Sequence, residues 1–232
     1  MSGARRDFFV TGTDTGVGKT LVSAALLRAL RGQGLAVAGM KPVASGAART
    51  SGGLRNEDAL ALAAETSRPW PYETINPYCF EPAIAPHLAA AEAGVEIRLG
   101  PIEQAFRRLQ AGSDAVIVEG AGGFLVPLGP GLSFADLPGE LGLGVILVVG
   151  LRLGCLNHSL LTVEAVSKRG LSFVGWVGNQ VDPGFDRLDA NLAVLLEQLP
   201  APCLGVIPPL CPPDIGLAAA SLGAIPDPGL PR

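Results

Sequence analysis

The segment VTGTDTGVGKT, from Val10 to Thr20, has the residue types that hold the phosphates of a nucleotide. Five residues separate Gly12 from Gly18, one more than in the familiar phosphate-binding loop that ends in Gly-Lys-Thr. A glycine-rich turn before a helix directs several backbone N–H groups at an anion, and the helix dipole favours negative charge there. Lys19 can reach the β- and γ-phosphates, and the Thr20 hydroxyl can ligate Mg²⁺. The segment therefore predicts phosphate binding between a strand and a helix.

Two acidic residues are candidates to complete a Mg²⁺ site, since Mg²⁺ normally takes one or two carboxylates besides the phosphates. Glu119 ends the apolar segment DAVIVEG, where burying a carboxylate without a partner is costly. Asp58, in LRNEDALAL, falls at the start of a predicted helix and is either a metal ligand or a favourable first-turn charge. The predicted metal ligands are Thr20, Asp58 and Glu119.

Lys41 and Asn179 follow other apolar segments and allow further chemistry. Lys41, in MKPVASG, is either a solvated strand end or a cation for a second anion, and Ser45 follows in a loop of small residues. Asn179, in GWVGNQVD, is either a turn residue or a reader of a purine edge through its amide. Its spacing to Asp182 is that of the guanine-reading motif of GTPases. However, Gln180 replaces the lysine of that motif, and EGAG replaces the D-x-x-G switch motif.

The elements that would position these residues alternate between strand and helix. Short apolar segments bounded by Gly, Asn or Pro predict strands at 7–12, 35–42, 114–120, 144–150, 171–179 and 203–208. Helix-favouring segments lie between them at 19–34, 57–65, 102–112, 157–170 and 186–199. Continuous apolar runs are typical of strands covered on both faces of a parallel sheet. The fold predicted is α/β, a doubly wound, mostly parallel sheet with helices on both faces and ligands at the carboxyl ends of its strands.

Two segments do not follow this alternation. The proline-rich segment 68–87 is expected to be a long irregular excursion with little regular structure. The C-terminal residues 225–232 are expected to be frayed. Neither a domain boundary nor an internal repeat is evident, so residues 1–232 are predicted to form a single domain.

Composition excludes several classes of function. The 232 residues are 48% hydrophobic and 16% charged, which is incompatible with disorder over the whole length. A net charge of −4, a pI of about 5.2 and scattered basic residues argue against nucleic acid or a membrane surface as partner. The cysteines form no CxxC pair and are predicted to be buried, reduced thiols: Cys79, Cys155, Cys203 and Cys211. Neither a signal peptide nor a membrane span is recognisable, so a cytoplasmic protein is expected.

The motifs together resemble those of the dethiobiotin synthetase family, in the P-loop NTPase superfamily. The matching segments run in order over nearly the whole chain: FVTGTDTGVGKT, GMKPVASG, GLRNEDALAL, INPYCF, APH, VEGAGG, VILVVGLRLGCLNHSLLT, FVGWVGN and PAPCLGVIP. The lengthened phosphate loop is itself the form that this family has.

The resemblance implies an ATP- and Mg²⁺-dependent cyclo-ligase that joins CO2 or bicarbonate to 7,8-diaminopelargonic acid. One amine would form a carbamate, ATP would activate it as a carbamic–phosphoric anhydride, and the second amine would close the ureido ring. The catalytic residues implied are Lys41 and Lys19. Nucleotide contacts are implied for Gly16, Val17, Gly18, Lys19, Thr20, Leu21, Asp58, Glu119, Gly120, Ala121, Gly122, Asn179, Gln180, Pro208, Pro209 and Leu210. Substrate contacts are implied for Thr15, Ser45, Gly154, Cys155 and Asn157.

The resemblance further implies a homodimer with the substrate between its subunits. The helix start in LGCLNHS would then receive the distant carboxylate of a substrate bound to the second chain. Two residues depart from the pattern of some relatives. Gly16 replaces a glutamate near the substrate amine, and Gln180 replaces an aspartate beside the adenine reader, which bears on the choice among ATP, CTP and GTP.

A regulatory ATPase of the partition and septum-site type is the main alternative, as a binding switch rather than a biosynthetic enzyme. Such proteins carry a signature lysine five residues before the invariant lysine of the loop. This chain has Asp14 at that position, which favours the biosynthetic interpretation.

Overall fold

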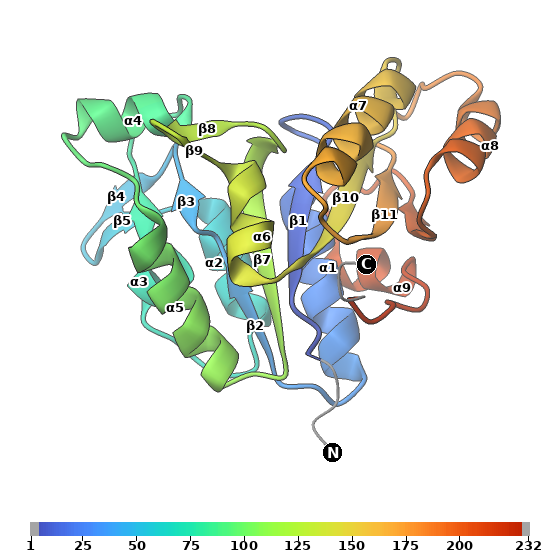
Figure 1. Ribbon diagram of the computed structural model, residues 1–232. Coiled ribbons are helices and arrows are strands. Elements are labelled where there is room, and N and C mark those ends of the chain that lie inside the picture. The colour runs from blue at the N-terminus through green and yellow to red at the C-terminus, as the bar shows by residue number, and fades with distance from the viewer. Residues whose placement is uncertain (1–4, 229–232) are drawn as a thin grey trace.

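The computed structural model describes residues 5–228, and a six-stranded sheet forms its centre (Figure 1). The strands lie in the order β12-β11-β10-β1-β7-β2, and every neighbouring pair is parallel. Their bounds are β1 Phe8–Gly12, β2 Val37–Met40, β7 Ala115–Gly123, β10 Gly144–Gly150, β11 Phe173–Asn179 and β12 Cys203–Ile207. Each overlaps a predicted strand, so the predicted parallel sheet is confirmed.

Helices cover both faces of the sheet because alternate side chains of each strand point to opposite faces. On one face, Phe8 and Val10 of β1 pack with α1 (Lys19–Gly32), α2 (Glu57–Glu65) and α9 (Ile215–Ala220). On the other, Phe9 packs with α5 (Leu99–Ala111) and α6 (Leu137–Leu141). Further along that face, Leu147 and Trp176 pack with α7 (Cys155–Lys168) and α8 (Leu188–Gln198). The doubly wound arrangement is therefore present as predicted.

The segment 68–87 is irregular over most of its length, but it contains short elements that the sequence did not predict. They are α3 (Tyr72–Ile75), β6 (Tyr78–Cys79) and the start of α4 (Pro86–Glu92). Strand β6 pairs in parallel with β3 (Val43–Ala44), just after β2. Elements of two to seven residues are too short for hydrophobic periodicity to reveal. The excursion therefore lies against the segment that follows Lys41.

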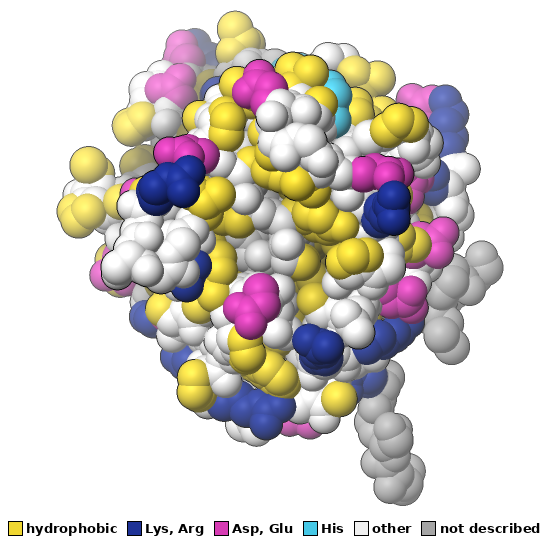
Figure 2. Space-filling model, turned by 90° about the vertical axis from the view of Figure 1, so that its left-hand side faces the viewer, with side chains coloured by type: hydrophobic (Ala, Val, Ile, Leu, Met, Phe, Trp, Pro, Cys, Tyr) yellow, Lys and Arg dark blue, Asp and Glu magenta, His cyan; other side chains and the backbone are white. Residues whose placement is uncertain are grey.

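Other short elements were also not predicted, for the same reason of length. Two antiparallel hairpins pair β4 (Ala48–Thr50) with β5 (Gly53–Arg55) and β8 (Pro127–Gly129) with β9 (Leu132–Ser133). A 3₁₀ turn at Phe134–Asp136 leads into α6. The side of the molecule formed by α4, α5 and the β4–β5 hairpin faces the viewer in Figure 2, where acidic and basic side chains are interspersed.

The prediction of a frayed C-terminus is wrong for residues 225–228. Ile225 is 4% exposed and joins the core beside α1 and α9, so burial of its apolar side chain holds this segment in place. The Arg6 guanidinium also donates to Asp227 Oδ1 at 2.7 Å. Residues 229–232, which were included in that prediction, lie outside the described residues.

Two smaller expectations are also corrected. Helix α7 begins at Cys155 rather than at residue 157, because Gly154 takes the left-handed φ of 95° that allows the chain to enter the helix there. All four cysteines are free, but Cys155 alone among them is buried. Cys79, at the end of the two-residue β6, and Cys203, at the start of β12, are half-buried, and Cys211, in the loop after β12, is exposed.

The helices in the described part of the chain are each too short or too polar to cross a lipid bilayer.

Candidate active site

The carboxyl ends of β1, β2 and β7 open into one cavity of about 780 Å³. Parallel strands end at the same edge of a sheet, which is why residues far apart in the sequence meet here. The predicted site residues that line this cavity are Thr15, Gly16, Gly18, Lys19, Thr20, Lys41, Ser45, Asp58, Glu119, Ala121 and Gly122. The phosphate loop, both lysines and both acids therefore share one space.

The phosphate loop depends on glycines for its shape. Gly16 and Gly18 have φ of 73° and 85°, values that side chains disfavour. A Cβ at Gly18 would also collide with the amide of Asn179. The loop delivers Lys19 as the first residue of α1, and the Lys19 ammonium donates to the Asp14 carbonyl at 3.0 Å.

Asn179, the last residue of β11, holds this loop through a hydrogen bond. It is 7% exposed, and its Nδ2 donates to the Val17 carbonyl at 2.9 Å. One amide hydrogen of Asn179 is therefore used by the phosphate loop. The sequence suggested a base reader at this position but gave no sign of the contact with Val17.

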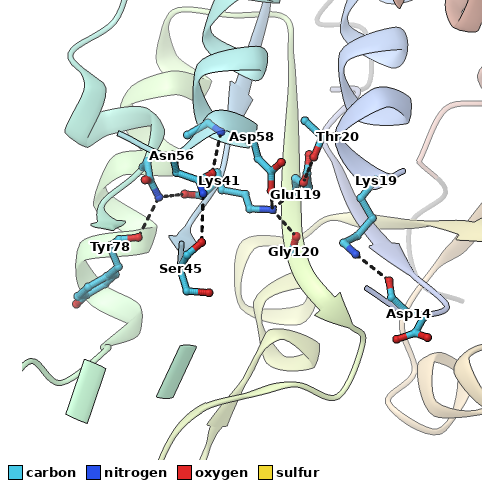
Figure 3. Close-up of polar contacts among 12 residues, drawn as sticks. Asp14, Lys19, Thr20, Lys41, Ser45, Asn56, Asp58, Tyr78, Glu119 and Gly120 are labelled. Carbon is cyan, nitrogen blue, oxygen red and sulfur yellow. Dashed lines mark hydrogen bonds and ion pairs between the residues drawn. The ribbon is translucent and has the colours of Figure 1, made fainter. Parts of the chain in front are cut away.

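Lys41 forms the centre of the site (Figure 3). It is 2% exposed, and its ammonium donates to Glu119 Oε1 at 2.7 Å and to the Gly120 carbonyl at 3.0 Å. A third partner is Asp58 Oδ2, at 2.9 Å. Burial lowers the pKa of Lys41, but the charges of Glu119 and Asp58 outweigh burial, and the pKa lies above its ordinary value. Lys41 is therefore a permanent cation in this site.

Glu119 joins Lys41 to the phosphate loop. Its Oε1 also accepts the Thr20 hydroxyl at 2.9 Å, and the residue is fully buried. The expectation that Glu119 ends its strand is wrong, because β7 continues to Gly123 after a shift in its register with β1. The other oxygen, Glu119 Oε2, is buried and has no hydrogen-bond partner among the described residues. A buried carboxylate oxygen without a partner is costly, which indicates that a ligand completes the site.

The oxygen donors around Glu119 fit Mg²⁺. Burial raises the pKa of Asp58, but the charge of Lys41 and the hydrogen bond from Lys41 outweigh it, so the pKa lies below its usual range and the group is a carboxylate. Thr20 thus lies beside two carboxylates, all hard oxygen donors suited to Mg²⁺. No three His, Cys, Asp or Glu side chains converge on a metal position within the described residues. Phosphate oxygens and water would have to complete the coordination, as is usual for Mg²⁺ bound with a nucleotide.

The pKa of the second lysine of the cavity, Lys19, is shifted in the opposite direction from that of Lys41. Burial, followed by the positive charge of Lys41, lowers the pKa of Lys19 to about 8. The acids Glu119, Asp58 and Asp14 raise it, but by less. Two ammonium groups that share one cavity favour an anion there, and the carboxylates of Glu119 and Asp58 offset part of their charge.

The comparisons with known proteins agree with this geometry. A family model described as "AAA domain" matches residues 6–212. The ATP-dependent dethiobiotin synthetase BioD of Pseudomonas paraeruginosa is 55% identical over 215 residues, which cover 92% of this chain and 93% of that protein. The enzymes of the same name from Aromatoleum aromaticum and Xanthomonas oryzae pv. oryzae are 52% and 51% identical. They cover 94% and 93% of this chain and 96% of each relative.

The chain belongs to the dethiobiotin synthetase family.

Two solved structures show that this member of the dethiobiotin synthetase family shares its fold with proteins of other families. The MinC:MinD cell division protein complex of Aquifex aeolicus matches with a TM-score of 0.57 and 14% identity, over 94% of this chain and 86% of that chain. A ParA family ATPase of Chlorobium tepidum matches with a TM-score of 0.57 and 13% identity, over 94% of this chain and 90% of that chain. At these identities the likeness concerns the P-loop NTPase fold alone.

Several predicted residues of this dethiobiotin synthetase family member do not line the cavity. Val17 is buried behind the loop, and Gly120 contributes its carbonyl to Lys41. The start of α7 lies elsewhere, and so do the ends of β11 and β12. The predicted residues outside the cavity are Val17, Leu21, Gly120, Gly154, Cys155, Asn157, Asn179, Gln180, Pro208, Pro209 and Leu210.

Sequence reasoning missed a polar network that supports Lys41 and α2. Asn76 donates to the Lys41 carbonyl at 2.7 Å, and the Tyr72 hydroxyl donates to Asn76 Oδ1 at 3.0 Å. The same hydroxyl accepts the backbone N–H of Asn56 at 2.8 Å, and Asn56 caps α2 by accepting from the N–H of Ala59. The Asn before an acidic first turn was a readable cap signal. The hydrogen bonds of Tyr72 and Asn76 join segments that are distant in the sequence, so no local sequence pattern predicted them.

Proposed function

We infer that the chain catalyses the ATP-dependent formation of dethiobiotin from 7,8-diaminopelargonic acid and CO2, with release of ADP and phosphate. Relatives at 51–55% identity over nearly the whole chain are ATP-dependent dethiobiotin synthetases. The observation in the structure that carries the inference is that Lys19 and Lys41 line the same cavity. The partition-type and GTPase-like alternatives are not favoured, because the relatives that match nearly the whole chain are dethiobiotin synthetases and the likeness to a ParA family ATPase is limited to the fold.

We propose that the phosphate loop binds the triphosphate of ATP and that Lys19 holds the phosphoryl group being transferred. Lys19 begins α1, so its ammonium and the N-terminal N–H groups of the helix favour the same anion. The partners proposed for the nucleotide base lie at the ends of β11 and β12. These ends are adjacent, since the Gln180 N–H donates to the Ile207 carbonyl at 3.0 Å, just before Pro208. This adjacency supports a base site formed by Asn179, Gln180 and residues 208–210.

We propose that Lys41 stabilises negative charge on the carbamate and on the transferring phosphoryl group. An ammonium has three hydrogens, and in this structure all three have acceptors: Glu119, Asp58 and Gly120. A carbamate can therefore contact Lys41 by hydrogen bonding only when one partner withdraws. Asp58 is the partner able to do so, because its side chain is 41% exposed and lies at the start of a helix. Thr15 and Ser45, which line the same cavity, are proposed to contact the reacting amine end.

We propose that Thr20, Asp58 and Glu119 hold Mg²⁺ together with the phosphates. When bound there, Mg²⁺ would neutralise charge on the β- and γ-phosphates. The unpartnered Oε2 of Glu119 and the Thr20 hydroxyl support this set of ligands.

A homodimer is proposed, in which the start of α7 from one chain completes the substrate site of the other. Two features support this arrangement. Gly154, Cys155 and Asn157 do not line the cavity of their own chain. Leu153 is 91% exposed beside them, and Leu161 on α7 is also exposed, as expected of a surface that a partner covers. We further propose that the chain acts as a single domain in the cytoplasm, where four free cysteines remain reduced.

The test is phosphate release from ATP by the purified protein, with and without the diamine and bicarbonate. Release should require both co-substrates and should be matched by dethiobiotin in equal amount. Parallel reactions with CTP and GTP determine the nucleotide preference, which Gln180 leaves open. ATP hydrolysis that proceeds at the same rate without the diamine would instead identify a regulatory ATPase.

A further inference from the structure

The phosphate loop contains an acidic residue, Asp14, whose three oxygen atoms are all engaged. Its Oδ2 accepts from the Arg152 guanidinium at 2.6 Å, and its Oδ1 accepts the backbone N–H of Thr15 at 2.7 Å. Its main-chain carbonyl accepts the Lys19 ammonium at 3.0 Å. Asp14 therefore determines both the shape of the loop and the position of its lysine.

A negative charge at this position opposes the binding of a triphosphate. Burial and Lys41 are the main influences that lower the pKa of Lys19, but Asp14 is among the carboxylates that raise it. Asp14 is close enough to Lys19 for its negative charge to act on the Lys19 ammonium, so the same charge would repel an anion held by that ammonium. An uncompensated Asp14 would weaken the anion site that the loop glycines and α1 provide.

Arg152 supplies the compensation from the other side of the loop. It lies between the end of β10 and the start of α7, 138 residues away from Asp14 in sequence. The two side chains are 41% and 48% exposed, and ion pairs at such positions contribute little to folding stability. The pair is therefore better explained by its place beside the phosphate loop than by stability.

We propose that Arg152 is a positioning residue that neutralises Asp14 and thereby sets the affinity of the phosphate loop for ATP. The inference rests on the proposed nucleotide site. It assigns Arg152 an indirect role through Asp14, distinct from a direct contact with the phosphates. It also explains how the loop tolerates an acid: Asp14 orders the loop through Thr15 and Lys19 while Arg152 cancels its charge.

The test is a double-mutant cycle read out by direct binding of Mg-ATP in titration calorimetry and by the KM for ATP. Arg152→Ala should weaken ATP binding by about tenfold, the order expected for a nearby uncompensated charge. On an Asp14→Asn background the same substitution should change affinity by less than about twofold, since no charge remains to be neutralised. Arg152→Lys keeps the charge and should retain most of the affinity.

Arg49→Ala is the matched control. Arg49 forms an ion pair of the same 2.6 Å length with Glu81, also on the surface, but neither residue lines the cavity. Its loss should leave the affinity for ATP unchanged. The penalty of Arg152→Ala should also shrink in about 1 M salt, where the Debye length falls to about 3 Å, whereas a packing defect would persist.

Two results would overturn the inference while leaving the proposed function intact. One is ATP affinity in Arg152→Ala equal to that of the unsubstituted protein. The other is a loss of the same size on the Asp14→Asn background, which would make Arg152 a direct phosphate ligand. If the unsubstituted protein does not bind ATP at all, the proposed function fails and the inference fails with it.

Discussion

Replacement of Lys41 by methionine tests the centre of the site most directly. The side chain is 2% exposed and its ammonium has three acceptors within 3.0 Å, one of which, Glu119, is fully buried. Methionine fills a similar volume without charge. Loss of one member of a buried ion pair costs roughly 3–5 kcal/mol, because the other charge is left uncompensated. Since Thr20 remains as a donor to Glu119, we expect a loss near 3 kcal/mol in the free energy of unfolding.

The expected effect of Lys41→Met on catalysis is larger than its effect on nucleotide binding. Removal of one preorganised charge-stabilising group typically lowers kcat by about 10²–10³-fold. ATP affinity should fall by no more than about tenfold, because Glu119 and Asp58 lose a compensating charge but the phosphate loop and Lys19 are unaltered.

The assays are urea unfolding, calorimetric ATP binding, and dethiobiotin formation with the diamine and bicarbonate. Lys41→Met combined with Glu119→Gln is the informative companion, since it removes both charges of the buried pair. Replacing both members of such a pair is often close to neutral, so this variant should regain most of the lost stability but none of the activity. More than a tenth of the original kcat in Lys41→Met, or an unchanged unfolding free energy, would refute the role assigned to Lys41.

Two further predictions concern the groups on either side of Lys41. Because burial and Lys41 lower the pKa of Lys19 to about 8, the dissociation constant for ATP should be nearly constant below that pH and should rise by about tenfold per pH unit above it, as the ammonium loses its proton. The Lys19→Arg variant stays charged and should bind ATP with no such pH dependence. A dissociation constant that does not change with pH in the unsubstituted protein would contradict the shifted pKa. Tyr72→Phe removes the hydroxyl that hydrogen-bonds to both Asn56 and Asn76, so it should lower the unfolding free energy by about 1–2 kcal/mol. It should also lower kcat while leaving the affinity for ATP unchanged. Urea unfolding and steady-state kinetics would test these effects.

The gathering of the site could be predicted from the sequence because parallel strands end at one edge of their sheet. Lys41 and Glu119 lie at the ends of apolar runs and Lys19 follows another through the phosphate loop, and the structure brings all three to one cavity as expected. The same reasoning identified Asp58 through the helix that it begins. The roles of these residues in binding and catalysis stay predictions that the proposed experiments address.

What the sequence did not reveal depends on contacts between distant segments. The ion pair of Arg152 with Asp14 joins positions 138 residues apart, and the hydrogen bond from Asn179 to Val17 joins positions 162 residues apart. Neither contact produces a local spacing or periodicity. The three acceptors around the Lys41 ammonium likewise could not be predicted, because residue types alone do not give the distances between side chains.

The order of the strands also separates the two lysines within the sheet. β1 and β2, which lead into them, lie on opposite sides of β7. Neighbouring strands are about 4.8 Å apart, so the two chain segments leave the sheet about 10 Å from each other. The strand between them carries Glu119, so the same interposed strand that keeps the two cations apart also supplies a negative charge that acts on both. The sheet itself thus offsets the repulsion between two lysines that its topology brings to one edge.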